Sequence, residues 1–140
     1  MYQRKVYNLF ISHSWTYSDA YARFCTLLDK ATGFSYKNYS VPKDDPIHNA
    51  PTATALYLAI KRQMAPCNVV IIMAGVYATY SAWIDREIQI ATSEFTDPKP
   101  IIGVRPWGNE RISSIVSENA NEIVGWNTDS IVSAIKRHSI

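Results

Sequence analysis

The stretch that decides the fold reads VVIIM at residues 69–73, followed by SAWIDRE at residues 81–87. A short apolar run of β-branched residues is typical of a buried strand. The segment after it is predicted to be a helix, in which Trp83 and Glu87, four residues apart, share one face. This puts an aromatic ring beside a carboxylate just beyond the C-terminal end of a strand, where open α/β sheets bind ligands. The pair is therefore a candidate for binding a sugar and stabilising a positive charge that develops on that sugar.

Strand and helix patterns alternate along the rest of the chain. Ser18 is the expected N-cap of the first helix, Gly33 its expected end, and Asn127 or Thr128 the expected N-cap of the last helix. The patterns predict strands over residues 6–11, 34–41, 67–73, 101–104 and 122–126, and helices over roughly 19–32, 53–65, 83–95, 110–117 and 128–138. This alternation implies right-handed crossovers and a parallel sheet. The sequence therefore predicts an α/β, flavodoxin-like three-layer fold with strand order 2-1-3-4-5, formed by residues 1–140 as a single domain.

Composition and charge indicate an ordinary globular protein. Of the 140 residues, 47% are hydrophobic and 19% charged, and the formal net charge is +2. Lys and Arg are scattered, so nothing favours nucleic-acid binding, and no apolar run approaches the roughly 18 residues of a membrane span. Cys25 and Cys67 are expected to be buried apolar groups in a reducing compartment, which favours a cytoplasmic protein. His13, His48 and His138 are too dispersed to indicate a metal site.

Three motifs, taken in order along the chain, resemble those of one family. The chain reads FISHSW at residues 10–15, DDPI at residues 44–47 and WIDRE at residues 83–87. With this order and spacing it resembles a TIR domain of the bacterial TIR-like type found in Thoeris anti-phage defence. The first segment is similar to the first TIR box, the second to the mobile BB loop, and the third to the WxxxE arrangement of enzymatic members. The second box lacks the Arg-Asp…Pro-Gly form of animal receptor TIR domains, which weighs against receptor-style scaffolding.

The resemblance implies an enzyme that cleaves the nicotinamide–ribose bond of NAD+, with NAD+ as substrate and no separate cofactor. Its products would be nicotinamide and ADP-ribose, or a cyclised or modified isomer that signals to an effector protein. The resemblance also implies that Glu87 is the catalytic residue and that Trp83 covers the nicotinamide or ribose. Self-association through TIR contacts is implied as well, because such sites often borrow a loop from a neighbouring copy.

Further candidate contacts with the substrate lie near the first and second motifs. Backbone N–H groups and hydroxyls from Ser12 to Ser14 are expected to bind phosphates where the first strand meets the first helix. Phe10 is expected to pack on the nicotinamide side. Besides Trp83, the expected substrate contacts are Phe10, Ser12, His13, Ser14, Trp15 and Asp45.

The residues also permit other interpretations. Glu87 beside Arg86 is compatible with a solvated helix acid, and Trp83 with a core residue. A Ser12–His13 nucleophile is disfavoured because adjacent strand residues point to opposite faces. Two alternatives stay open for the whole chain: a non-catalytic TIR interaction module that assembles through residues 42–49, and an enzyme similar to nucleoside deoxyribosyltransferases.

Overall fold

The computed structural model describes residues 5–12, 20–39, 53–74, 82–105 and 112–140. Within these ranges, strands and helices alternate along the chain. The strands are β1 (Val6–Ile11), β2 (Ser35–Asn38), β3 (Val69–Met73), β4 (Ile101–Val104) and β5 (Glu122–Val124), and the helices are α1 (Ala20–Asp29), α2 (Ala53–Met64), α3 (Ala82–Ser93), α4 (Ser114–Asn119) and α5 (Thr128–His138). None of the helices in these ranges is long and apolar enough to cross a membrane.

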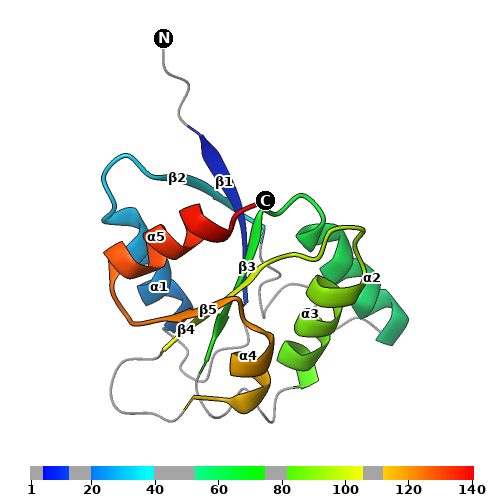
Figure 1. The fold of residues 1–140 in the computed structure, drawn as a ribbon. Coiled ribbons are helices and arrows are strands. Elements are labelled where there is room, and N and C mark those ends of the chain that lie inside the picture. The colour runs from blue at the N-terminus through cyan, green and yellow to red at the C-terminus, as the bar shows by residue number, and fades with distance from the viewer. Residues whose placement is uncertain (1–4, 13–19, 40–52, 75–81, 106–111) are drawn as a thin grey trace.

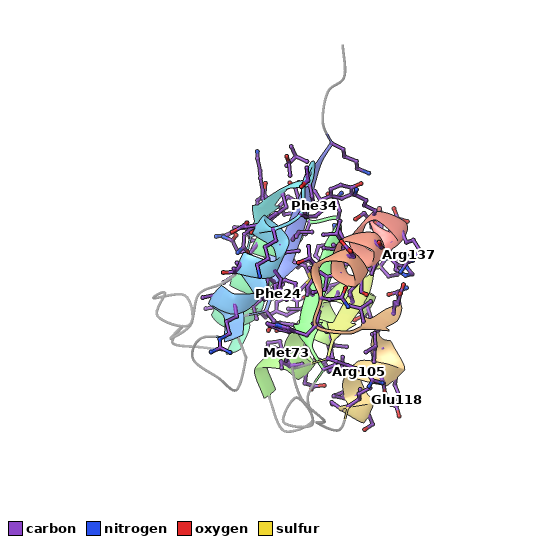
Figure 2. The ribbon with its side chains drawn as sticks, turned by 90° about the vertical axis from the view of Figure 1, so that its left-hand side faces the viewer. Phe24, Phe34, Met73, Arg105, Glu118 and Arg137 are labelled. Carbon is purple, nitrogen blue, oxygen red and sulfur yellow. The ribbon has the colours of Figure 1, made fainter. Side chains whose placement is uncertain are left out.

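The five strands form one parallel sheet in the order β2-β1-β3-β4-β5. The predicted α/β fold and strand order are thus confirmed. Because the strands run in the same direction, their carboxyl ends meet at one edge of the sheet, which is the edge where such sheets bind ligands. Figure 2 shows Met73 and Arg105, at the carboxyl ends of β3 and β4, at the opposite end of the molecule from Phe34, which precedes β2.

Helices cover both faces of the sheet, with α1 and α5 on one face and α2, α3 and α4 on the other (Figure 1). Alternate residues of the central strands enter opposite apolar layers. The layer under α1 and α5 includes Leu9, Ile11, Ile71 and Met73, and the layer under α2 and α3 includes Phe10, Val70 and Ile72. The same period of two puts Ser12, which follows β1, on the face covered by α3.

The bounds of β1 and β4 agree with the prediction, whereas other elements differ for local reasons. β3 begins after Cys67, because the backbone N–H of Cys67 still donates to the carbonyl of Met64 in α2, at 2.9 Å. α4 begins after Ser113, later than predicted, because Ser113 is extended (φ −64°, ψ 129°) and its N–H donates to the carbonyl of Ala74 at 2.8 Å. β2 and β5 are both shorter than the predicted strands.

The ends of α1 and α5 show which of the expected capping residues the chain uses. Asn127 is the N-cap of α5, where its side chain accepts a hydrogen bond from the backbone N–H of Ser130 at 2.8 Å. The hydroxyl of Thr128 instead donates to the carbonyl of Leu27 at 2.7 Å, which ties α5 to α1. α1 ends before Gly33, whose φ of 75° is a conformation that glycine adopts at little cost. The expected cap at residue 18 lies outside the described residues.

Candidate functional site

Glu87 is a buried carboxylate on α3, with only 1% of the residue exposed. Its helix neighbours Ile84, Ile88 and Ala91 are buried in the apolar layer beneath α2 and α3. This part of α3 therefore faces the protein interior. A charged side chain is rarely buried to this extent unless polar groups accompany it. The interpretation of Glu87 as a solvated helix acid is wrong.

Ser12 supplies a polar partner for Glu87. The hydroxyl of Ser12 donates to Oε1 of Glu87 at 2.8 Å, and both residues are buried. The backbone N–H of Ser12 donates to the carbonyl of Ile71 at 3.0 Å, which extends the pairing of β1 with β3 past the end of β1. The Ser12–Glu87 contact thus joins the end of β1 to α3 at the carboxyl edge of the sheet, where the sequence predicts the site.

Backbone hydrogen bonds hold the strand ends together along this edge. The N–H of Ala74 donates to the carbonyl of Val104, and the N–H of Arg105 donates to the carbonyl of Val124, each at 2.8 Å. Ser113 is also buried here, and its N–H donates to the carbonyl of Ala74. Sequence reasoning missed Ser113, because no periodic spacing or motif marks that segment. These hydrogen bonds extend the pairing of β3 with β4 and of β4 with β5 past the ends of the strands.

The structure locates only part of the remaining predicted site. Trp83 lies on α3, one turn before Glu87, as predicted, but the placement of its side chain is outside what the structure describes. Phe10 is fully buried in the layer beneath α2 and α3, which gives it a packing role. A contact between Phe10 and nicotinamide stays a prediction. The roles of four further residues also stay predictions, since these residues lie outside the described ranges: His13, Ser14, Trp15 and Asp45.

The structure changes the expectation for Ser12. Its hydroxyl donates to Glu87 and its backbone N–H donates to Ile71, so both donors bind groups within the protein. A phosphate could take either donor only by breaking one of these hydrogen bonds. The geometry therefore favours a contact between Ser12 and the catalytic candidate over the expected contact between Ser12 and a phosphate.

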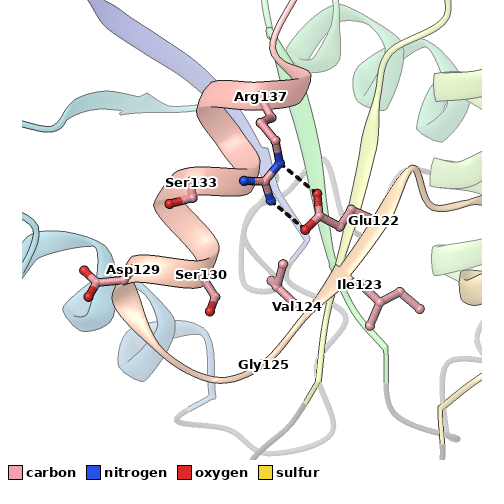
Figure 3. Close-up of a pocket in the computed structure, with 8 residues that line it drawn as sticks. All are labelled: Glu122, Ile123, Val124, Gly125, Asp129, Ser130, Ser133 and Arg137. Carbon is pink, nitrogen blue, oxygen red and sulfur yellow. Dashed lines mark hydrogen bonds and ion pairs between the residues drawn. The ribbon is translucent and has the colours of Figure 1, made fainter.

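A separate surface pocket of about 440 Å³ lies beside β5 and α5 (Figure 3). It is lined by Glu122, Ile123, Val124, Gly125, Asp129, Ser130, Ser133 and Arg137. Neither Ser12 nor Glu87 is among the lining residues, so this pocket is distinct from the candidate site. Sequence reasoning did not identify it, because its two walls are brought together by the packing of α5 against β5.

The charged side chains at this pocket form an ion-pair cluster. Arg137 donates to Glu122 through Nε and Nη2, and Nε2 of His138 lies 2.9 Å from Oε1 of the same carboxylate. The hydrogen bonds from Arg137, and to a smaller extent the contact with His138, hold the pKa of Glu122 below its ordinary value. In the part of the chain that the structure describes, no three His, Cys, Asp or Glu side chains gather closely enough to hold a metal ion.

Comparison with known proteins identifies the family. Residues 10–111 match the family model described as Thoeris protein ThsB, TIR-like domain. The matched segment includes Ser12, Trp83 and Glu87 and runs from the end of β1 past β4. No curated protein matches the chain. Because the match spans well over half of the 140 residues, the chain belongs to the family of TIR-like domains of the Thoeris protein ThsB.

Proposed function

We propose that this protein cleaves the nicotinamide–ribose bond of NAD+ and forms a cyclic or modified ADP-ribose signal. Its family supports a role in Thoeris-type anti-phage defence. The observation that carries the enzymatic proposal is the buried carboxylate of Glu87, which receives the Ser12 hydroxyl at the carboxyl edge of the sheet. Burying a carboxylate costs folding free energy, and such groups are often found where chemistry requires them.

The reaction needs what this carboxylate provides. When the bond between ribose C1′ and the nicotinamide nitrogen breaks, its electron pair stays with the nitrogen. Nicotinamide, which is cationic in NAD+, therefore leaves as a neutral molecule and needs no general acid. The positive charge moves to the ribose as an oxocarbenium ion, as in glycoside hydrolysis. The negative charge of Glu87 stabilises that cation, and does so more strongly in a water-poor site than in bulk water.

The product depends on what attacks the cation. Water adds to the cation, loses a proton and gives ADP-ribose. Attack by a nucleophilic atom of the bound ADP-ribosyl group itself, with loss of a proton, gives a cyclised product that is one water lighter than ADP-ribose. In this proposal Trp83, one helical turn before Glu87, covers the nicotinamide or ribose and excludes water. The other substrate contacts come from His13, Ser14, Trp15, Asp45 and Phe10. The product then carries the signal to an effector protein, and self-association of the chain completes the site.

Incubation of the purified full chain with NAD+ tests this proposal. The chain is assayed alone, at high concentration, fused to an oligomerising domain, and with lysate from phage-infected cells, and the products are identified by mass spectrometry. We expect one nicotinamide released for each NAD+ consumed, together with ADP-ribose, an isomer of the same mass, or a cyclised product that is one water lighter. Absence of nicotinamide under all four conditions would contradict the proposal and favour a non-catalytic interaction module.

A parallel assay separates the proposal from nucleoside deoxyribosyltransferase-like chemistry. The same preparation is given a deoxynucleoside and a second free base in place of NAD+, and base exchange is followed by chromatography. We expect no exchange. Exchange without consumption of NAD+ would assign the carboxylate to nucleoside chemistry.

A further inference from the structure

We infer that Ser12 is a positioning residue for Glu87. The hydroxyl of Ser12 holds the carboxylate of Glu87 in one orientation and favours its charged form. The inference rests on the proposed function, because it assigns Ser12 a role in the same reaction. It replaces the expected contact of Ser12 with a phosphate by a contact with the side chain that stabilises the ribose cation.

The backbone of Ser12 is held in place on the sheet side of this contact. Ser12 follows β1 directly, and its N–H donates to the carbonyl of Ile71 in the central strand β3 at 3.0 Å. None of the residue is exposed. Phe10, two residues earlier, is buried on the same face of the sheet, so the pleat aims the Ser12 side chain toward the layer beneath α3.

The helix side of the contact is held equally well. Ile84, Ile88 and Ala91 bury the inner face of α3, which fixes the backbone of Glu87 relative to the sheet. With both backbones fixed, the hydrogen bond from Ser12 to Oε1, at 2.8 Å, restricts rotation of the carboxylate group. The orientation of a group that stabilises a transition state is set in this way before substrate arrives, so little reorganisation is needed during the reaction.

The direction of the hydrogen bond also favours the charged state. A serine hydroxyl that donates to a carboxylate stabilises the ionised form more than the protonated one. Without that donor, the buried group would be easier to protonate, because burial disfavours its charge. A protonated Glu87 would lose the negative charge on which its proposed role depends. The two buried side chains therefore act as a pair. Glu87 stabilises the cation, and Ser12 keeps the Glu87 carboxylate oriented and charged.

The test compares Ser12→Ala, which removes the donor, with Ser12→Cys, which keeps a weaker donor of similar size. The matched control is Thr128→Val, which removes another long-range hydroxyl hydrogen bond, that to Leu27, far from Glu87 along the chain. Nicotinamide release from NAD+ is measured from pH 4 to pH 9 under the condition that activates the wild type. Denaturant unfolding of each variant checks that it is folded.

We expect Ser12→Ala to lower kcat by about 10- to 100-fold with a smaller effect on KM. We also expect the acidic limb of its pH profile to move to higher pH, with Ser12→Cys between Ser12→Ala and the wild type. Thr128→Val should keep the wild-type profile. If Ser12→Ala and Thr128→Val lose activity alike and neither shifts the acidic limb, Ser12 is only structural and the inference is overturned.

Failure of the inference and failure of the proposed function give different results. A wild type that never releases nicotinamide overturns the proposed function and the role of Ser12 together. The inference alone is overturned if the wild type is active, Glu87→Gln is inactive and Ser12→Ala has wild-type kinetics. If Ser12→Ala does not fold, the profile of Ser12→Cys decides, because an unshifted acidic limb in that variant also overturns it.

Discussion

Glu122 on β5 and Arg137 on α5 face each other at the surface pocket and are joined by two hydrogen bonds (Figure 3). Nε of Arg137 lies 3.2 Å from Oε1 of Glu122, and Nη2 lies 2.6 Å from Oε2. His138 contacts the same carboxylate at 2.9 Å. A single acidic side chain thus ties the last turn of the last helix to the edge strand of the sheet.

This ion-pair cluster predicts a pH dependence of stability. The pKa of Glu122 is lower in the folded protein than its ordinary value of 4.5, chiefly because Arg137 donates to the carboxylate. The cluster therefore stabilises the fold above about pH 4.5, and this contribution is lost as the pH falls through the folded-state pKa. We expect Glu122→Gln to lower the free energy of unfolding at pH 7 by up to about 1 kcal/mol, since the pair is solvent-exposed.

Urea unfolding of wild type and Glu122→Gln at pH 7 and at pH 3 measures this contribution. The difference between the two proteins should shrink at pH 3 and also at high salt, which screens exposed charges. An equal difference at both pH values would show that the carboxylate acts by packing rather than by charge.

Gly103 in β4 predicts a steric effect in the core. A Cβ atom at this position would lie 3.1 Å from Cγ1 of Val116 and 3.2 Å from Cγ1 of Ile123. Both neighbours would have to shift, so we expect Gly103→Ala to destabilise the protein by about 1–3 kcal/mol, as overpacking of cores does. Gly125→Ala is the control, because its Cβ would meet only the side chain of Asn127, at 3.8 Å. Equal unfolding midpoints for both variants in urea would refute this account.

Cys67 is predicted to be unreactive in the folded protein. It is buried, and burial raises the pKa of its thiol to about 12. At pH 8 only about one thiol in 10⁴ would be ionised, and the thiolate is the reactive form. In a Cys25→Ser variant, we expect a thiol-specific reagent to modify Cys67 in denaturant and to leave it unmodified over the same period in buffer. Rapid modification in buffer would show that the site is open to solvent.

The fold follows closely from the sequence, because local patterns carry most of the information. The apolar run at residues 69–73 predicts the central strand, and all of its residues are buried. The bounds of β1 and β4 agree with the predicted ones. The prediction of two buried cysteines is confirmed for Cys67, whereas Cys25 is only half-buried. The predicted and observed boundaries differ most at the start of α4. There the backbone N–H of Ser113 donates to the carbonyl of Ala74, and the helix begins only after Ser113. Such a long-range contact cannot be recognised from the local sequence.

The candidate site follows from the sequence only in part, for the same reason. Helical spacing and the family motif identify Glu87, yet a glutamate beside an arginine is equally typical of a solvated surface. Its burial depends on the packing of α3 against the sheet, and its hydrogen bond comes from Ser12, 75 residues away. No periodicity relates two residues at that separation. From the sequence, Ser12 is expected to bind a phosphate because it lies at the end of a strand. That position in the sequence does not show that its hydroxyl and its backbone N–H already have hydrogen-bond partners within the protein.

If the carboxylate of Glu87 stabilises a ribose cation, the uncharged amide of a Glu87→Gln variant removes that stabilisation. Gln has nearly the same shape, and its Oε1 can still accept the Ser12 hydroxyl, so the fold should persist by circular dichroism and urea unfolding. Glu118→Gln, which alters an exposed carboxylate on α4, is the matched control.

The deciding measurement is the rate of nicotinamide release from NAD+ by these two variants and the wild type, under one activating condition. We expect Glu87→Gln to be slower than the wild type by about 10²-fold or more, whereas Glu118→Gln should match the wild type. A folded Glu87→Gln variant that releases nicotinamide at the wild-type rate would contradict the proposed role of Glu87.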